Sequence, residues 1–229
     1  MLSNDLASAE VVDALLLTPK ARVIAPIRVW RRGADDFLLL TEPELGETVR
    51  STLLRARFAA KCEIEPEEHS SAIVFGSAEG IPNADYGEPA VEVLDSPVEP
   101  TMPDDELEVM RIRAGTPRFG REIDDRVLPA EAGLVERAVS FTKGCFPGQE
   151  PIARLRYRGH ANRGLRLLAW DSEELPAYDE PVAYEGKDVG RVTSAARDGD
   201  RIVALAYVRV EVPADAELEV GSAKARPLD

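Results

Sequence analysis

Residues 143–150 read Lys-Gly-Cys-Phe-Pro-Gly-Gln-Glu, and the interpretation of the whole chain starts from this stretch. Cys145, one of two cysteines in 229 residues, lies here between a Lys-Gly pair and a Phe-Pro-Gly turn. The turn leads into an apparent helix start, where backbone N–H groups carry partial positive charge. Together with Lys143 they favour the thiolate, which is the reactive form of cysteine. The stretch predicts a loop that presents an activated or ligand-contacting cysteine; the alternative is a cysteine packed beneath the loop.

The same eight residues resemble the signature of the YgfZ-type folate-binding proteins, which are relatives of the glycine-cleavage T-protein, an aminomethyltransferase. The resemblance continues on both sides of the signature and towards both ends of the chain. It includes residues 3–6, 111–125, 128–134, 151–166 and 190–196. The resemblance therefore spans nearly the whole chain.

The resemblance implies an α+β protein in which a mixed α/β folate-binding region precedes a small antiparallel β-barrel. The expected boundaries are 1–158 for the T-protein-like region and 159–229 for the barrel. The implied function is that of a cytoplasmic accessory protein that binds tetrahydrofolate or another folate. Such a protein supports assembly or repair of iron–sulfur client proteins, including those that modify tRNA, with Cys145 as its central residue.

The residues after Cys145 suit recognition of a pterin ring. Gly148 lets the backbone approach a ligand closely, Gln149 offers a donor and an acceptor, and Glu150 accepts hydrogen bonds. The alternative is that Gln149 and Glu150 only cap the helix. The full set of residues expected to bind folate is Lys143, Gly144, Gly148, Gln149, Glu150, Arg113, Arg154 and Arg158.

The charge of the chain is uneven. The formal net charge is −14, which argues against a protein that coats nucleic acid, yet residues 137–166 hold seven basic residues and one acid. This basic island suggests a local anionic ligand, such as the glutamate tail of folate, a phosphate or RNA. The alternative is a solvated face paired with the abundant acids. Arg154 and Arg158 would share one face whether the segment is a helix or a strand.

Three features depart from the aminomethyltransferase pattern. Ala25 and Pro26 stand where the enzyme has an acidic pair, and neither can accept a proton. Arg113 stands where the enzyme supplies a carboxylate to the pterin, and a cation cannot accept N–H donors. The family also has several dozen residues before the segment that begins here at Ser3. A chain shortened there would lack an edge strand, and self-association could cover the gap.

Two other functions stay open. One is a folate-dependent aminomethyl transferase, which Ala25 and Pro26 disfavour. The other is a module that binds RNA or a protein through residues 137–166 without folate.

Other chemistry has less support in the sequence. His160 is a candidate base for Cys145, although a hydrogen-bonded turn residue is the alternative. Cys62 is expected to be a partly buried packing residue. The cysteines and histidines do not cluster, so the sequence does not suggest a metal site. No apolar run is long enough for a membrane span.

Apolar patterning and turn residues predict the elements of the chain. Residues 23–31 and 37–40 form a hairpin, and a helix capped by Thr41 runs to about Ala60 with Phe58 on its apolar face. A second helix spans 104–113. Further strands are expected at 62–66, 72–75 and 91–94, and barrel strands at 165–170, 182–184, 188–194, 201–212 and 217–220.

Overall fold

The computed structural model describes residues 1–57, 60–97 and 99–228. It divides into two compact units, each built from two separate stretches of chain. The first unit contains Met1–Ser70 and Ile123–His160, and the second contains Ser71–Glu122 and Ala161–Asp229. The domain boundary expected between residues 158 and 159 stays a prediction. In the structure, residues 71–122 group with the barrel rather than with the first unit.

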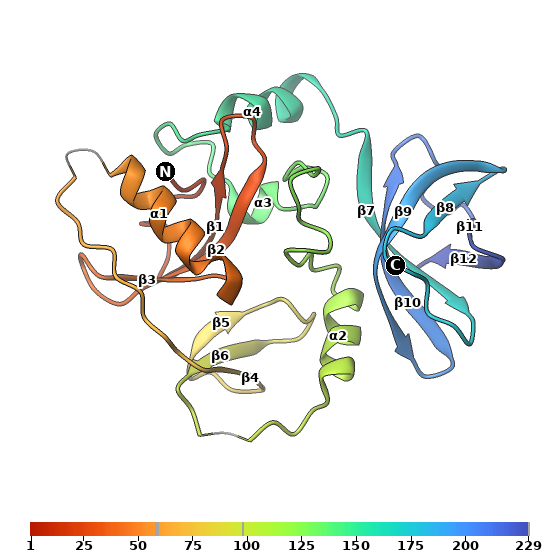
Figure 1. The fold of residues 1–229 in the computed structure, drawn as a ribbon, viewed down its shortest axis with the longest axis horizontal. Coiled ribbons are helices and arrows are strands. Elements are labelled where there is room, and N and C mark those ends of the chain that lie inside the picture. Colours follow the sequence, from red (N-terminus) through yellow and green to blue (C-terminus); the bar gives the residue numbers. More distant parts are fainter. Residues whose placement is uncertain (58–59, 98, 229) are drawn as a thin grey trace. The chain divides into compact units, whose positions relative to one another are not determined.

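The first unit is built on a three-stranded antiparallel sheet in the order β1-β2-β3 (Figure 1). Its strands are β1 (Val11–Leu17), β2 (Val23–Arg31) and β3 (Phe37–Leu40). Side chains of β2 alternate between buried and half-buried, so one face of the strand fills the core. The predicted hairpin of β2 and β3 is confirmed, with Val29 opposite Leu39.

Strand β1 was not predicted, because the residues at its end do not alternate between apolar and polar types. Ala14 to Leu17 are all buried, so the end of the strand reads as a short continuous apolar run. Such a run cannot be assigned to a strand or a helix by periodicity alone. In the structure Ala14 lies opposite Ile27 of β2, and Leu16 lies opposite Ala25.

The helix predicted from Thr41 to about Ala60 is shorter than expected. A 3₁₀ turn at Pro43–Leu45 precedes α1 (Gly46–Ala56), and Arg57 follows the helix as its C-cap. Thr41 does not cap it, because the Thr41 hydroxyl donates to the carbonyl of Pro26, 2.8 Å away. Phe58 lies outside the described residues. The strand predicted at 62–66 is wrong, since those residues form no strand.

Two further helices complete the first unit, α3 (Val135–Ala138) and α4 (Gln149–Arg158). Helix α1 packs against β2, and α3 packs against β1. Helix α4 begins directly after Gly148 of the 143–150 stretch. The segment after the signature, which could have been a helix or a strand, is therefore a helix.

The second unit holds a small sheet in the order β4-β6-β5, the helix α2 and a closed barrel. The small sheet consists of β4 (Ser71–Phe75), β5 (Ile81–Asn83) and β6 (Ala90–Leu94). Helix α2 spans Asp104–Arg113, as predicted. The barrel strands, in chain order, are β7 (Arg163–Asp171), β8 (Pro181–Tyr184), β9 (Lys187–Asp198), β10 (Arg201–Arg209), β11 (Leu218–Val220) and β12 (Ala223–Pro227).

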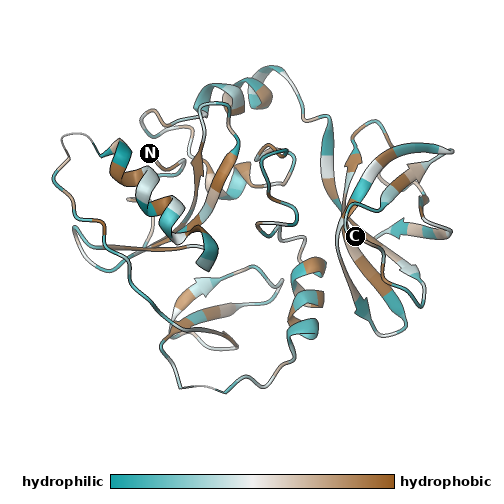
Figure 2. Cartoon of the chain, in the orientation of Figure 1, coloured by the Kyte–Doolittle hydropathy of each residue, from teal (hydrophilic) through white to brown (hydrophobic). Residues whose placement is uncertain are grey.

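The barrel confirms the predicted α+β class, and its interior is a packed core. Apolar side chains from β7 to β12 fill it, including Leu168, Ile202 and Leu218, which are fully buried. Figure 2 shows apolar residues along these strands and along β2. The strand β12 was not predicted, because Ala-Lys-Ala-Arg-Pro carries little apolar signal.

Helix α2 packs against the outer face of β9 and β10 in the barrel wall. Ile112, which is fully buried, packs in a cluster with Val203 and Leu205 of β10. Arg111 is also buried and donates to both carboxylate oxygens of Glu108, to Glu122 and to Ser194 of β9. The hydroxyl of Tyr207 donates to the carbonyl of Glu122 at 2.8 Å. Apolar packing and a buried polar network therefore join residues 104–122 to the barrel. No helix in the described part of the chain is long and apolar enough to cross a membrane.

Candidate ligand site at the start of helix α4

The buried hydroxyl of Ser3 fastens the chain that leads into the 143–150 stretch. It donates to the carbonyl of Ala138 at 2.6 Å and accepts the amide N–H of Leu15 at 2.7 Å. The backbone of Ser3 bonds to Leu15 and to Ser140, both at 3.0 Å. The sequence therefore holds residues 138–140 against β1, and this fixes where the signature stretch begins.

Lys143 ties the start of the stretch to the residues on either side of Ser3. Its ammonium group donates to the carbonyls of Leu2 at 2.6 Å and Asn4 at 3.1 Å, and lies 5.8 Å from the centre of the Phe146 ring. Burial lowers the pKa of Lys143, against the opposing charge of Asp5. The observed contacts of Lys143 are structural, and its expected roles towards Cys145 and a ligand stay predictions.

Cys145 is exposed in the loop before α4. The alternative of a cysteine packed beneath the loop is therefore wrong. The prediction for Cys62 is wrong as well, because Cys62 is exposed in a segment without regular structure. His160 is exposed and forms no hydrogen bond with any residue that the structure describes, so neither a pairing with Cys145 nor a hydrogen-bonded turn is seen.

Gly148 brings α4 against the turn between β1 and β2. Its φ of +83° is left-handed, and a Cβ here would lie 2.8 Å from the carbonyl oxygen of Thr18 and 2.9 Å from the Cα of Ala21. The turn is itself closed by Thr18, which accepts the N–H of Ala21 on its carbonyl and the N–H of Arg22 on its hydroxyl. The glycine predicted for ligand approach is thus required for approach of the protein's own backbone.

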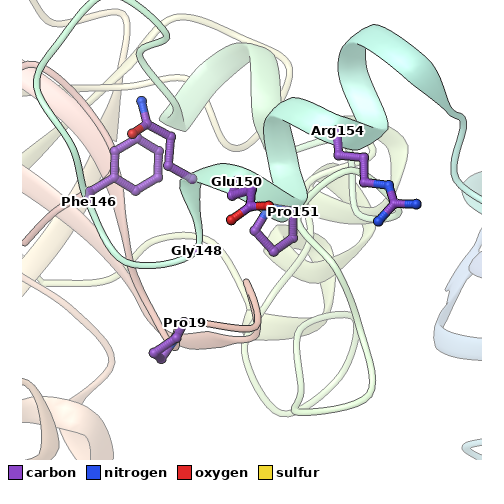
Figure 3. A pocket seen from close by; sticks show the side chains of 7 residues that line it. Pro19, Phe146, Gly148, Glu150, Pro151 and Arg154 are labelled. Atoms are coloured by element: carbon purple, nitrogen blue, oxygen red, sulfur yellow. The ribbon is translucent and has the colours of Figure 1, made fainter.

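A cavity of about 480 Å³ lies at this junction (Figure 3). Its lining joins three polar side chains with apolar ones from the turn, the loop and the first turn of α4. The lining residues are Pro19, Phe146, Gly148, Gln149, Glu150, Pro151 and Arg154. Four of the predicted folate-binding residues are therefore brought together: Gly148, Gln149, Glu150 and Arg154.

The polar groups of this cavity are available to a ligand. Within residues 1–57, 60–97 and 99–228, the side chains of Gln149, Glu150 and Arg154 form no hydrogen bond or ion pair. The alternative that Gln149 and Glu150 cap α4 is therefore not seen. Glu150 and Arg154 are exposed, so the cavity presents one anion and one cation beside an amide.

Sequence reasoning missed the apolar lining residues. Phe146 is buried, at 6% exposure, and belongs to the signature stretch itself, while Pro151 follows it directly. Only the fold brings Pro19 here, through the turn that contacts Gly148. Lys143, Gly144 and Cys145 precede the cavity and do not line it.

The basic island is partly compensated within the structure. Arg137 pairs with Asp13, Arg156 pairs with Glu136, and Arg166 donates to backbone carbonyls of residues 209–213. Arg158 is exposed at the end of α4 and, among the residues described, has no such partner. Acids therefore neutralise part of the basic island, whereas Arg154 and Arg158 have no acidic partner among the described residues.

The role of Arg113 towards folate stays a prediction. Arg113 belongs to the second unit, where its guanidinium pairs with Asp198 at 2.6 Å. Ala25, fully buried, and Pro26, half-buried, both lie in β2. Neither brings a side-chain acid to the first unit. No group of three or more histidine, cysteine or acidic residues suited to a metal ion occurs in the described part of the chain.

Comparison with known proteins first defines the class of fold. The aminomethyltransferase T of the glycine cleavage system from Bartonella henselae has a TM-score of 0.81 and 18% identity. The match covers 100% of this chain and 78% of that one. The chain therefore has the fold of that aminomethyltransferase, which at this identity is a statement about fold alone.

Sequence comparison then gives the particular resemblance. The chain is 36% identical over 115 residues to the tRNA-modifying protein YgfZ of Edwardsiella ictaluri, and 32% identical to that of Yersinia pestis. Each match covers 48% of this chain and 35% of the relative, about a third of its length. A Haemophilus influenzae protein without a functional name is 27% identical over 203 residues, covering 83% of this chain and 72% of its own. No protein-family model matches. The predicted resemblance to YgfZ-type proteins is confirmed over the matched part of the chain.

Proposed function

We propose that this chain is a folate-binding accessory protein that supports assembly or repair of iron–sulfur proteins, including those that modify tRNA. The observation that carries the folate part is the cavity at the start of α4, where the side chains of Gln149, Glu150 and Arg154 have no partner in the described structure. Its volume of about 480 Å³ lies within the usual range of small-molecule sites, roughly 300–1,000 Å³.

The lining fits the parts of a folate. The Glu150 carboxylate can accept two N–H donors from the amino-pyrimidine edge of a pterin, and Gln149 can both donate and accept. Phe146, Pro19 and Pro151 offer apolar surface to a planar ring. Arg154 supplies a positive charge for the glutamate tail. These residues bind and orient the ligand, and the folate itself would supply any one-carbon chemistry.

The role of Cys145 is inferred from two facts. Its thiol is exposed, and it directly precedes Phe146, which lines the cavity. An exposed thiol in a loop that is held by Ser3 and Lys143 can meet a client protein directly. We assign Cys145 to contact with iron–sulfur clients. Aminomethyl transfer is the second candidate, supported by the shared fold. The absence of an acid at Ala25 and Pro26 makes it the weaker one.

Calorimetric titration of the whole chain with tetrahydrofolate tests the folate part. We expect saturable micromolar binding by the wild type. Glu150→Gln removes a charged acceptor, and a hydrogen bond to a charged group contributes about 1.5–3 kcal/mol, so its affinity should fall roughly tenfold or more. Glu136→Gln, an exposed acid on α3, is the matched control and should bind as the wild type does.

Either of two results would contradict the folate part. One is no binding up to millimolar folate, which corresponds to about −4 kcal/mol or weaker. The other is equal loss of affinity in Glu150→Gln and Glu136→Gln, which would place the ligand elsewhere.

The iron–sulfur part has a separate test. In cells that lack the protein, the activity of an iron–sulfur tRNA-modifying enzyme should fall, and the wild-type gene should restore it. Cys145→Ala should fail to restore it, although it should still bind folate. Full restoration by Cys145→Ala would remove the cysteine from the proposal. Turnover of an aminomethyl donor by the purified chain would instead favour the transferase.

A further inference from the structure

The last turn of α4 carries an exposed aromatic ring beside arginines. Tyr157 is 68% exposed, the largest value among the exposed large apolar side chains of the described chain. Its ring meets Phe141 edge to face, with centroids 6.0 Å apart at 72°. The guanidinium of Arg156 lies 4.3 Å from the centre of the Phe141 ring. We call Phe141, Arg156, Tyr157 and Arg158 the α4 end patch.

The ring of Tyr157 is held in place although it faces solvent. Phe141 supports it from one side, and Phe141 is itself covered by Arg156, which is tied to Glu136 at 2.8 Å. A ring supported in this way loses little conformational freedom when a second planar group stacks on it. The patch thus offers a preformed stacking surface, distinct from the residues that line the cavity.

Arg158 supplies the uncompensated charge of the patch, because Arg156 is paired with Glu136. Arg158 has no hydrogen-bond or ion-pair partner among the described residues, and the acid of α4, Glu150, lies eight residues away. At 1.5 Å per residue this separation is about 12 Å, which exceeds the Debye length of about 8 Å at physiological ionic strength. Arg158 therefore presents a positive charge beside Tyr157 despite the net charge of −14.

We propose that the α4 end patch binds an unpaired stretch of nucleic acid. Arginines that contact phosphates and an exposed aromatic ring on which a base stacks are the two parts of single-strand recognition. A duplex would not use Tyr157, because its bases are already stacked. An acidic polypeptide could pair with Arg158 but has no flat group for the ring. The proposal does not rest on folate binding.

Fluorescence anisotropy of the whole chain with a fluorescein-labelled 12-nucleotide single strand, as RNA and as DNA, tests this. Binding of either strand should be saturable at 50 mM salt and weaker at 200 mM. Arg158→Gln should reduce the slope of log K against log salt by about 0.7, the value for one lost phosphate contact. Tyr157→Ala should weaken binding roughly tenfold and leave that slope unchanged, and Tyr157→Phe should bind as the wild type does.

Arg55→Gln on α1 is the matched control, because it removes one charge from an exposed helical arginine of the same unit. It should alter neither affinity nor slope. No saturable binding at 50 mM salt would overturn the proposal, as would equal effects of Arg55→Gln and Arg158→Gln. Displacement of the strand by poly-glutamate, with Tyr157→Ala binding normally, would show a surface for acidic proteins instead. Tyr157 and Arg158 are both exposed, so their replacement should not disturb the fold. The circular dichroism spectrum of each variant should therefore match that of the wild type.

Discussion

Gly148 shows at the scale of one residue how a signature glycine can serve the fold. Its left-handed backbone and its contact with the turn at Thr18 leave no room for a side chain. Gly144, in the same stretch, has no atom within 4 Å of a Cβ built on it. The two glycines of one motif therefore have different physical demands, which the sequence alone does not separate.

We predict that Gly148→Ala destabilises the first unit by about 2–4 kcal/mol, from left-handed strain and the contacts with Thr18 and Ala21. Gly144→Ala should change stability by less than about 0.5 kcal/mol. Urea unfolding followed by the fluorescence of Trp30, which lies in β2, measures both. Equal stability of the two variants would show that α4 and the β1–β2 turn can separate without cost.

Part of the candidate site could be read from single residues. Gln149, Glu150 and Arg154 were expected at a ligand site, and the structure gathers them at one cavity. Ser3 fell within the family resemblance, but nothing in the sequence showed that its hydroxyl ties β1 to Ala138. Pro19 could not be found at all, because its proximity to α4 exists only after the hairpin has formed. Cys62 was misjudged because free cysteines are usually buried.

At the scale of elements, local signals decided which predictions held. Asp104–Arg113 carries acids in its first turn and arginines in its last, and the helix has these bounds in the structure. The Thr41 cap failed because its hydroxyl found a tertiary partner, the carbonyl of Pro26. β1 and β12 escaped notice because pairing with neighbouring strands, rather than their own pattern, makes them strands.

Helix α2 also carries a pH-dependent contribution to stability. Burial acts to raise the pKa of Glu108, but the hydrogen bond and charge of Arg111, with Arg118 and Arg121, outweigh it and lower the pKa below 4.5. A carboxylate whose pKa is lower in the folded state stabilises the fold above its unfolded pKa. This contribution is therefore present above pH 4.5 and is lost as pH falls from 4.5 through the lowered value.

We predict that Glu108→Gln lowers the melting temperature at pH 7 by roughly 5 °C, since it removes charged hydrogen bonds to Arg111. The difference from wild type should shrink as pH falls below 4.5. Glu106→Gln, an exposed acid of the same helix without an ion pair among the described residues, should show neither effect. A difference that stays constant between pH 7 and pH 3 would contradict the account. Differential scanning calorimetry across this pH range provides the measurement.

At the scale of the whole molecule, the barrel was predicted from short β-type runs spaced by turns, and it is confirmed. What the runs could not reveal is that residues 71–122 group with the barrel rather than with the sheet they follow. This grouping depends on tertiary contacts of Ile112 and Arg111, which leave no local signature in the sequence.

We predict that Ile112→Ala destabilises α2 and the barrel together. Removing a fully buried isoleucine costs about 2–5 kcal/mol, and its neighbours Val203 and Leu205 belong to β10. Hydrogen exchange of amides in β9 and β10 should accelerate along with that of α2. Val49→Ala, a buried residue of α1 in the first unit, should leave β9 and β10 unchanged. Faster exchange confined to α2 would show that the barrel is stable by itself.

The exposure of both thiols makes the chain unusually convenient to label. Cys62 and Cys145 are free and open to solvent, so air oxidation during storage will couple molecules through intermolecular disulfides unless a reductant is present. Replacing Cys62 by serine leaves one maleimide-reactive position, three residues before Gly148. A fluorophore attached there would report entry of a small molecule at the start of α4 without altering any side chain of the cavity lining.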